Sequence, residues 1–152
     1  MNNLTVVPTV YDHLDKITDI EKDCFSNPWS RASFEASLAA DKLQTCLTAL
    51  LDGEAAGYIC IFHLFEEGEL LNIAVSPKYR RLGIAQRLID EMLTLLKTKN
   101  VERVTLEVRQ SNISARSLYE KNGFLPIAVR KNYYTNPFED GIVMEKRLQA
   151  ET

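Results

Sequence analysis

The residues best suited to chemistry lie in a short basic turn, Arg80-Arg81-Leu82-Gly83-Ile84-Ala85, which follows an apolar, strand-like run, Leu70–Val75. The first N–H groups of a helix have no partner within it and carry the positive end of its dipole. Small residues also let a phosphate approach the backbone closely. We therefore expect an anion site at which these amides and the two arginines hold phosphate. The alternative that the turn alone leaves open is a solvated basic turn, with Gly83 supplying only an unusual φ.

A carboxylate and a phenol follow this turn in positions that suit proton transfer. Val104, Leu106 and Val108 alternate with polar residues, which predicts a strand with Glu107 on its polar face. There the carboxylate can take a proton from an amine, or simply pair with a cation such as Arg109. Tyr119 lies on the next short helix, where its phenol can donate a proton or its ring can pack that helix onto a sheet.

Other site types lack their sequence signals. The chain has no GxGxxG motif and no Gly-Lys-Ser/Thr motif, so Rossmann and P-loop sites are not indicated. His13 and His63 are isolated, and no Cys pair has metal-ligand spacing, so we expect no metal. We expect Cys46 and Cys60 to be reduced core residues.

Length and charge indicate an ordinary globular protein. The 152 residues suit one domain, 1–152, and the net charge of −3 does not indicate nucleic-acid binding. No apolar run approaches a membrane span and no signal peptide is evident, so we expect no membrane contact and a cytoplasmic location. The sequence leaves the oligomeric state open.

Periodicity and turn residues predict the order β-α-α-β-β-β-α-β-α-β-β, a mixed sheet with helices on both faces. Ser30 is expected to cap the second helix, Ser111 or Asn112 the fourth, and Gly123 to follow the fourth. The expected strands are Leu4–Val7, Gln44–Leu51, Ala55–Phe65, Leu70–Val75, Val104–Val108, Leu125–Val129 and Gly141–Leu148, and the expected helices are Tyr11–Phe25, Arg31–Ala40, Gly83–Asn100 and one from Ser111 or Asn112 to Asn122. Glu66-Glu67-Gly68 is expected to be a tight turn and Arg130–Asp140 a loop.

The basic turn fits the Q/R-x-x-G-x-G/A signature, and the whole element order resembles the GCN5-related N-acetyltransferase (GNAT) superfamily. A second match runs from Ser111-Asn112 through Leu118-Tyr119 to Gly123-Phe124. The resemblance implies an acetyltransferase with a mixed, mostly antiparallel sheet and acetyl-CoA as co-substrate. It implies main-chain contacts from Ile73, Ala74 and Val75 to the pantetheine arm, phosphate contacts from Arg80, Arg81, Leu82, Gly83, Ile84 and Ala85, further cofactor contacts from Asn112 and Tyr119, and thiolate protonation by Tyr119.

Four longer segments resemble the RimI subfamily, bacterial enzymes that acetylate the N-terminal alanine of small-subunit ribosomal protein eighteen. These segments are NIAVSPKYRRLGIA, LEVRQSN, LYEKNGF and RKNYY followed by ED, and Asn27-Pro28-Trp29-Ser30 resembles the first loop. Arg80 stands where Gln is common, which the signature permits. The resemblance implies that Glu107 is the general base, that transfer is direct in a ternary complex, and that a protein N-terminus is the acceptor.

The Arg130–Asp140 loop, with Trp29 opposite, is the expected acceptor site. Tyr133 and Tyr134 can wall a peptide slot, and Glu139 or Asp140 can meet a cationic group of the acceptor. A surface hairpin with solvated charges is the alternative for this loop. Two other functions stay open at this point: acetylation of a small amine, and a catalytically silent CoA-binding regulator.

Overall fold

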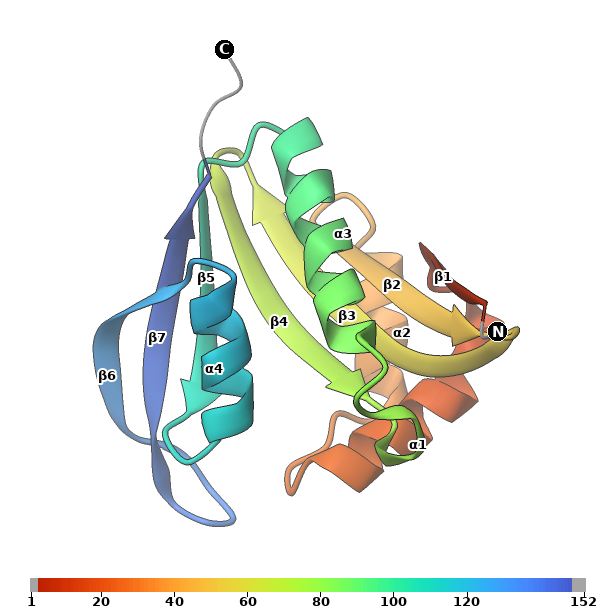
Figure 1. Ribbon diagram of the computed structural model, residues 1–152, viewed down its shortest axis with the longest axis horizontal. Coiled ribbons are helices and arrows are strands. Elements are labelled where there is room, and N and C mark those ends of the chain that lie inside the picture. The colour runs from red at the N-terminus through yellow and green to blue at the C-terminus, as the bar shows by residue number, and fades with distance from the viewer. Residues whose placement is uncertain (1–2, 149–152) are drawn as a thin grey trace.

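The computed structural model describes residues 3–148, whose strands form one seven-stranded sheet in the order β1-β2-β3-β4-β5-β7-β6 (Figure 1). Neighbouring strands are antiparallel except β4 and β5, which are parallel. The mixed, mostly antiparallel sheet predicted from the sequence is therefore confirmed. The elements are β1 Leu4–Pro8, α1 Leu14–Cys24, α2 Arg31–Ala39, β2 Gln44–Leu51, β3 Glu54–Leu64, β4 Glu67–Val75, α3 Ile84–Thr98, β5 Arg103–Arg109, α4 Ile113–Lys121, β6 Leu125–Tyr134 and β7 Glu139–Arg147.

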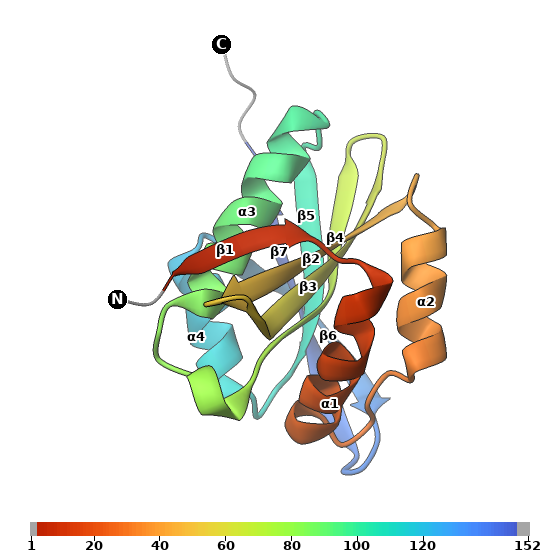
Figure 2. The same ribbon diagram turned by 90° about the vertical axis from the view of Figure 1, so that its right-hand side faces the viewer.

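Helices cover both faces of the sheet, as expected. Helices α3 and α4 lie on one face, while α1 and α2 lie on the other (Figure 2). Two clusters of buried side chains result. The larger one joins α3 to the sheet through Leu88, Ile89 and Met92, and the smaller one joins α1 and α2 to it through Leu14 and Phe34. The two helix layers hold the sheet between them, and the loops extend from the ends of its strands.

The predicted caps set the helix boundaries. Ser30 accepts a hydrogen bond from the Ser33 N–H at the start of α2, and Asn112 accepts one from the Ala115 N–H at the start of α4. After α4, Gly123 has φ +91°, a conformation that favours glycine at a helix end.

Several predicted boundaries are wrong. Strand β6 runs on to Tyr134 and β7 begins at Glu139, so most of the predicted 130–140 loop is strand. Strand β4 begins at Glu67, inside the predicted 66–68 turn. The first predicted helix begins with a separate 3-10 turn, Tyr11–His13. Because β6 is an edge strand exposed on both faces, its polar end has no alternating pattern to mark it.

Strands β4 and β5 pair only over part of their length. Their parallel ladder ends at Leu70 and Leu106, and the two strands diverge beyond it (Figure 1). On its other side β4 carries a bulge at Leu71, because β3 pairs Ile61 with Leu70 but Cys60 with Asn72. The end of β4 therefore turns away from β5 and opens the sheet edge there.

Cys46 and Cys60 are buried and reduced, as predicted. They face each other across β2 and β3, with their Sγ atoms 3.3 Å apart. Within residues 3–148, no helix is long and apolar enough to cross a membrane.

Candidate active site

A cavity of about 1030 Å³ opens where β4 and β5 diverge. Both candidate catalytic residues and most of the predicted cofactor contacts line it. The predicted residues in its wall are Ile73, Ala74, Val75, Arg80, Arg81, Gly83, Ile84, Ala85, Glu107, Asn112, Tyr119, Tyr134 and Glu139. The chain therefore brings residues from β4, α3, β5, α4 and β7 to one space.

The basic turn forms one part of this wall. Gly83 is the N-cap of α3 with φ +78°, and an added Cβ would meet no atom within 4 Å, so this position needs glycine for its backbone conformation. Within residues 3–148, the N–H groups from Gly83 to Gln86 donate to no other residue. They remain available to an anion at the helix N-terminus. Leu82 does not line the cavity and is 48% exposed.

Glu107 projects from β5 on the face opposite the α3 core, because its neighbours Leu106 and Val108 are buried in that core. Its carboxylate pairs with Arg130 at 3.0 Å, so the ion pair considered from the sequence is present, with Arg130 in place of Arg109. The neighbouring Tyr133 hydroxyl interacts with the same carboxylate, and this interaction is the main reason that the pKa of Tyr133 is raised. Glu107 thus faces two residues of β6, Arg130 and Tyr133.

Tyr119 reaches the cavity from α4 and is 6% exposed. Its ring lies 6.0 Å from that of Phe124, so the packing role considered from the sequence is present. Burial, followed by the neighbouring Tyr134, raises the pKa of Tyr119. Burial also raises the pKa of Tyr134 to about 12. Both phenols therefore stay protonated at neutral pH and can donate hydrogen bonds.

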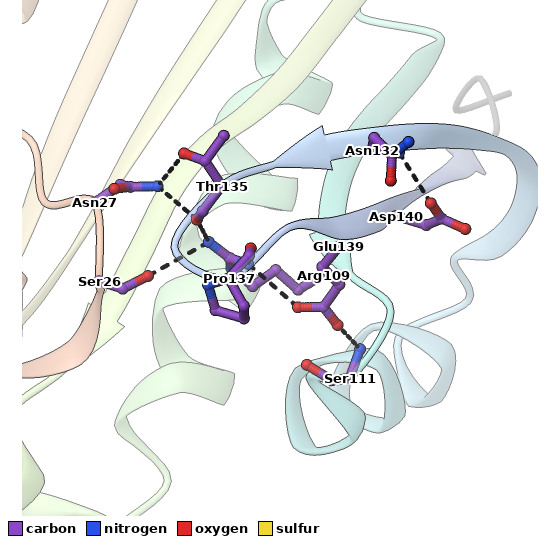
Figure 3. A network of polar contacts seen from close by, with 9 residues as sticks. All are labelled: Ser26, Asn27, Arg109, Ser111, Asn132, Thr135, Pro137, Glu139 and Asp140. Carbon is purple, nitrogen blue, oxygen red and sulfur yellow. Dashed lines mark hydrogen bonds and ion pairs between the residues drawn. The ribbon is translucent and has the colours of Figure 1, made fainter.

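The residues expected at the acceptor are only partly brought together. Tyr134 and Glu139 line the cavity, whereas Trp29, Tyr133 and Asp140 do not. The Trp29 ring packs against Phe34 at 5.3 Å, and its contact with an acceptor stays a prediction. Asp140 pairs with Lys131 and accepts from the Asn132 N–H (Figure 3), and these contacts lower its pKa.

Glu139 is also engaged inside the protein. It pairs with Arg109 at 3.2 Å and accepts a hydrogen bond from the Ser111 N–H (Figure 3). Hydrogen bonds from Ser111, followed by Arg109, keep the pKa of the Glu139 carboxyl below its ordinary value. Its charge is therefore already balanced by neighbouring residues, and its predicted contact with an acceptor cation remains a prediction.

A buried carboxylate that the sequence did not single out supports this region. Glu21 of α1 is 1% exposed and accepts from the Asn72 side chain at 2.7 Å, the Trp29 N–H at 2.9 Å and the Tyr58 hydroxyl. These three donors satisfy the hydrogen-bonding capacity of the buried carboxyl group. Glu21 thus joins β3, β4 and the loop between α1 and α2. Its place on the apolar face of a predicted helix was the one available signal.

Further residues of the cavity wall were missed because their types and spacing carry no chemical signal in the sequence. They include Cys24, Phe25, Ser26, Leu71, Asn136 and Pro137. Arg109 entered only as a possible partner of Glu107, although its position two residues along the same strand placed it on the same face. In the part of the chain that the structure describes, no group of three His, Cys, Asp or Glu residues is arranged to hold a metal ion.

Comparison with known proteins identifies the family. Residues 14–124 match the model of the acetyltransferase (GNAT) family. A Bacillus subtilis relative is 36% identical over 133 residues, 88% of each chain. The [ribosomal protein bS18]-alanine N-acetyltransferase of Salmonella typhimurium is 34% identical over 146 residues, 95% of this chain and 96% of its own.

Solved structures agree with this family. The crystal structure of the ribosomal-protein-S18-alanine N-acetyltransferase from Escherichia coli has a TM-score of 0.90 and 30% identity, and the match covers 100% of this chain and 97% of that one. Ard1 from Thermoplasma volcanium, at 23% identity, shares the fold with a TM-score of 0.88. The chain belongs to the GNAT family and is an acetyl-CoA-dependent N-acetyltransferase.

Proposed function

We propose that this enzyme acetylates the α-amino group of the N-terminal alanine of ribosomal protein bS18. The observation that carries the proposal is the shared cavity, in which a helix N-terminus with free amides, a carboxylate and a buried phenol meet. The named relatives, similar over almost the whole chain, support this acceptor. Work on a ribosomal protein would place the enzyme in the cytoplasm.

The donor half of the cavity suits an acyl-CoA. The amides of Gly83–Gln86, with Arg80 and Arg81 beside them, would bind the pyrophosphate. Beyond Leu70 the edge of β4 that faces the cavity has no partner strand within residues 3–148, so its main-chain groups can bind an extended pantetheine arm. An N–H of this edge would also polarise the thioester carbonyl. Acetyl-CoA, when bound, supplies the activated acetyl group.

The acceptor half supplies two proton-transfer groups. An α-amine is mostly protonated at neutral pH, so Glu107 would take its proton, directly or through water, before attack on the carbonyl carbon. Tyr119, protonated because it is buried, would donate to the departing thiolate. The acetyl group would pass directly to the amine as the C–S bond breaks, and the second proton that the nitrogen loses on becoming an amide would return to the Tyr119 phenolate, directly or through water.

The experiment is intact-mass analysis of recombinant bS18 after incubation with the enzyme and acetyl-CoA. We expect a single added acetyl group, located at the N-terminal alanine by peptide fragmentation. A polyamine, and a bS18 variant whose N-terminus is already blocked, serve as control acceptors and should yield no thiol release. If bS18 stays unmodified while the enzyme acetylates the polyamine, the acceptor is a small amine and not bS18.

A further inference from the structure

Arg109, at the end of β5, is the centre of a polar network over the acceptor end of the cavity (Figure 3). Its guanidinium donates to the Thr135 carbonyl at 2.6 Å and to the Pro137 carbonyl at 3.0 Å, both in the turn between β6 and β7. It also pairs with Glu139 at 3.2 Å and lies 4.6 Å from the centre of the Tyr134 ring. A planar guanidinium can make such contacts in several directions at once, which an ammonium cannot.

The same network reaches the loop that follows α1. Arg109 donates to the Ser26 hydroxyl at 3.4 Å, and the Asn27 side-chain amide donates to the Thr135 carbonyl at 2.8 Å and to its hydroxyl at 3.0 Å. Asn136 donates back to the Asn27 side chain at 3.0 Å. Two loops more than 100 residues apart in sequence are thereby joined into one arch, defined as residues 26–27 with residues 135–137 (Figure 3).

The arch is part of the reaction cavity. Ser26, Asn136 and Pro137 line the same space as Glu107 and Tyr119. The Arg109 charge is already matched by Glu139 and by main-chain carbonyls, so this residue is poorly suited to bind an anionic substrate. Its side chain is 22% exposed and that of Glu139 is 13% exposed, so this ion pair is better shielded from water than a pair at the surface.

We propose that Arg109 is a positioning residue for the acceptor: it fixes the 26–27 and 135–137 loops as one rigid wall for the incoming chain end. The inference rests on the proposed function, because that wall is useful only for a peptide acceptor. The proposed pyrophosphate and pantetheine contacts lie on β4 and the start of α3, so Arg109 sets acceptor binding and leaves acetyl-CoA binding largely unchanged.

The test variant is Arg109→Met, which keeps the apolar stem and removes the guanidinium. Loss of charge-assisted hydrogen bonds predicts a KM for a bS18 N-terminal peptide raised by about 10-fold or more. The Kd for acetyl-CoA, measured by calorimetry, should stay within about 2-fold of the wild-type value. Arg109→Lys, which keeps the charge but not the planar donor fork, should recover part of the loss.

Arg103→Met is the matched control. Arg103 lies at the other end of β5 and pairs with Glu67 and Glu145, outside the cavity. The Arg103→Met variant should lose a similar ion-pair network, and its KM for the peptide should equal the wild-type value. Asn27→Ala should raise the peptide KM as well, and the double variant Asn27→Ala/Arg109→Met should fall short of the product of the two single effects, because both residues hold the same arch.

Hydrogen–deuterium exchange gives a readout that does not depend on the acceptor. Amides of residues 25–30 and 134–139 should exchange faster in Arg109→Met but not in Arg103→Met. Unchanged exchange there, or a peptide KM equal to that of wild type or of Arg103→Met, overturns the proposal. If wild-type enzyme leaves the peptide unmodified while it still binds acetyl-CoA, the proposed acceptor fails, and the exchange experiment still decides whether Arg109 fixes the arch.

Discussion

Glu107 is paired with an exposed arginine, and this bears on how it can act as a base. Arg130, its ion-pair partner, is 56% exposed and can move aside when an acceptor amine arrives. We expect Glu107→Gln to lower turnover by about 10²–10⁴-fold, because the amide cannot take a proton. The Kd for acetyl-CoA should not change, since the proposed pyrophosphate and pantetheine contacts lie on β4 and at the start of α3. Thiol release under saturating peptide and calorimetry with acetyl-CoA measure the two quantities.

Glu145→Gln is the control for this experiment. Glu145 lies on the same face of the sheet and is also ion-paired, with Arg103 and Arg147, but it does not line the cavity. It should retain wild-type turnover. A Glu107→Gln enzyme as active as Glu145→Gln would mean that the amine loses its proton by another route.

Substitution of Tyr119 by phenylalanine separates the chemical role of its hydroxyl from the packing role of its ring. Phenylalanine keeps the ring that contacts Phe124, so Tyr119→Phe should remain folded with little loss of stability. Without the hydroxyl, the departing thiolate loses its proton donor, and we expect turnover to fall by about 10²-fold or more. Peptide KM and acetyl-CoA affinity should change little. Wild-type turnover in this variant would assign thiolate protonation to water or to Tyr134.

The role of the turn before α3 can be tested by a substitution that changes its backbone conformation. Gly83 and Gly53 have similar positive φ values, +78° and +86°, and neither would place a Cβ within 4 Å of another atom. Alanine should therefore strain both turns by about 1–2 kcal/mol without a clash. Thermal unfolding should show similar losses of stability for Gly83→Ala and Gly53→Ala.

Of the two variants, only Gly83→Ala should weaken the binding of acetyl-CoA. Gly53 lies in the hairpin between β2 and β3, outside the cavity, whereas strain at Gly83 is relieved by moving the amides that would meet the pyrophosphate. We expect a raised Kd for acetyl-CoA in Gly83→Ala and a wild-type Kd in Gly53→Ala. Equal affinities in the two variants would place the pyrophosphate away from this turn.

The elements of the proposed donor site were predictable from sequence because they are local. The β4 strand, the basic turn and α3 are consecutive, and each carries its own signal: an apolar run, a glycine with arginines, and a 3.6-residue period. The caps Ser30 and Asn112 were found for the same reason. Where the candidate binding residues and the elements that carry them lie within about 20 consecutive residues, the hydrophobic pattern and local propensity are enough to predict both.

The acceptor half was not predictable in the same way, because tertiary contacts define it. Glu107 pairs with Arg130 of β6, and Arg109 joins loops that lie 83 and 26 residues away in sequence. No period or spacing encodes such contacts. The length of β6 was missed for a related reason, since this edge strand is exposed on both faces and buries no alternating stripe.

For the molecule as a whole, buried tyrosines link stability to alkaline pH. Burial is the main cause that raises the pKa of both Tyr58 and Tyr119, and Glu21 adds to the effect at Tyr58. In the unfolded chain a tyrosine ionises near pH 10, whereas in the folded protein these two remain protonated beyond it. Above about pH 10 the unfolded state therefore binds fewer protons than the folded state, and stability must fall as pH rises.

We expect the free energy of unfolding in urea to lose up to about 1.4 kcal/mol per pH unit for each such tyrosine above pH 10, and to show no loss from these groups below it. Tyr119→Phe removes one titrating group, so its slope should be shallower by about that amount. Identical slopes in the wild-type enzyme and Tyr119→Phe would show that Tyr119 ionises in the folded enzyme as it does in water, which removes the physical reason for its protonated state in the reaction.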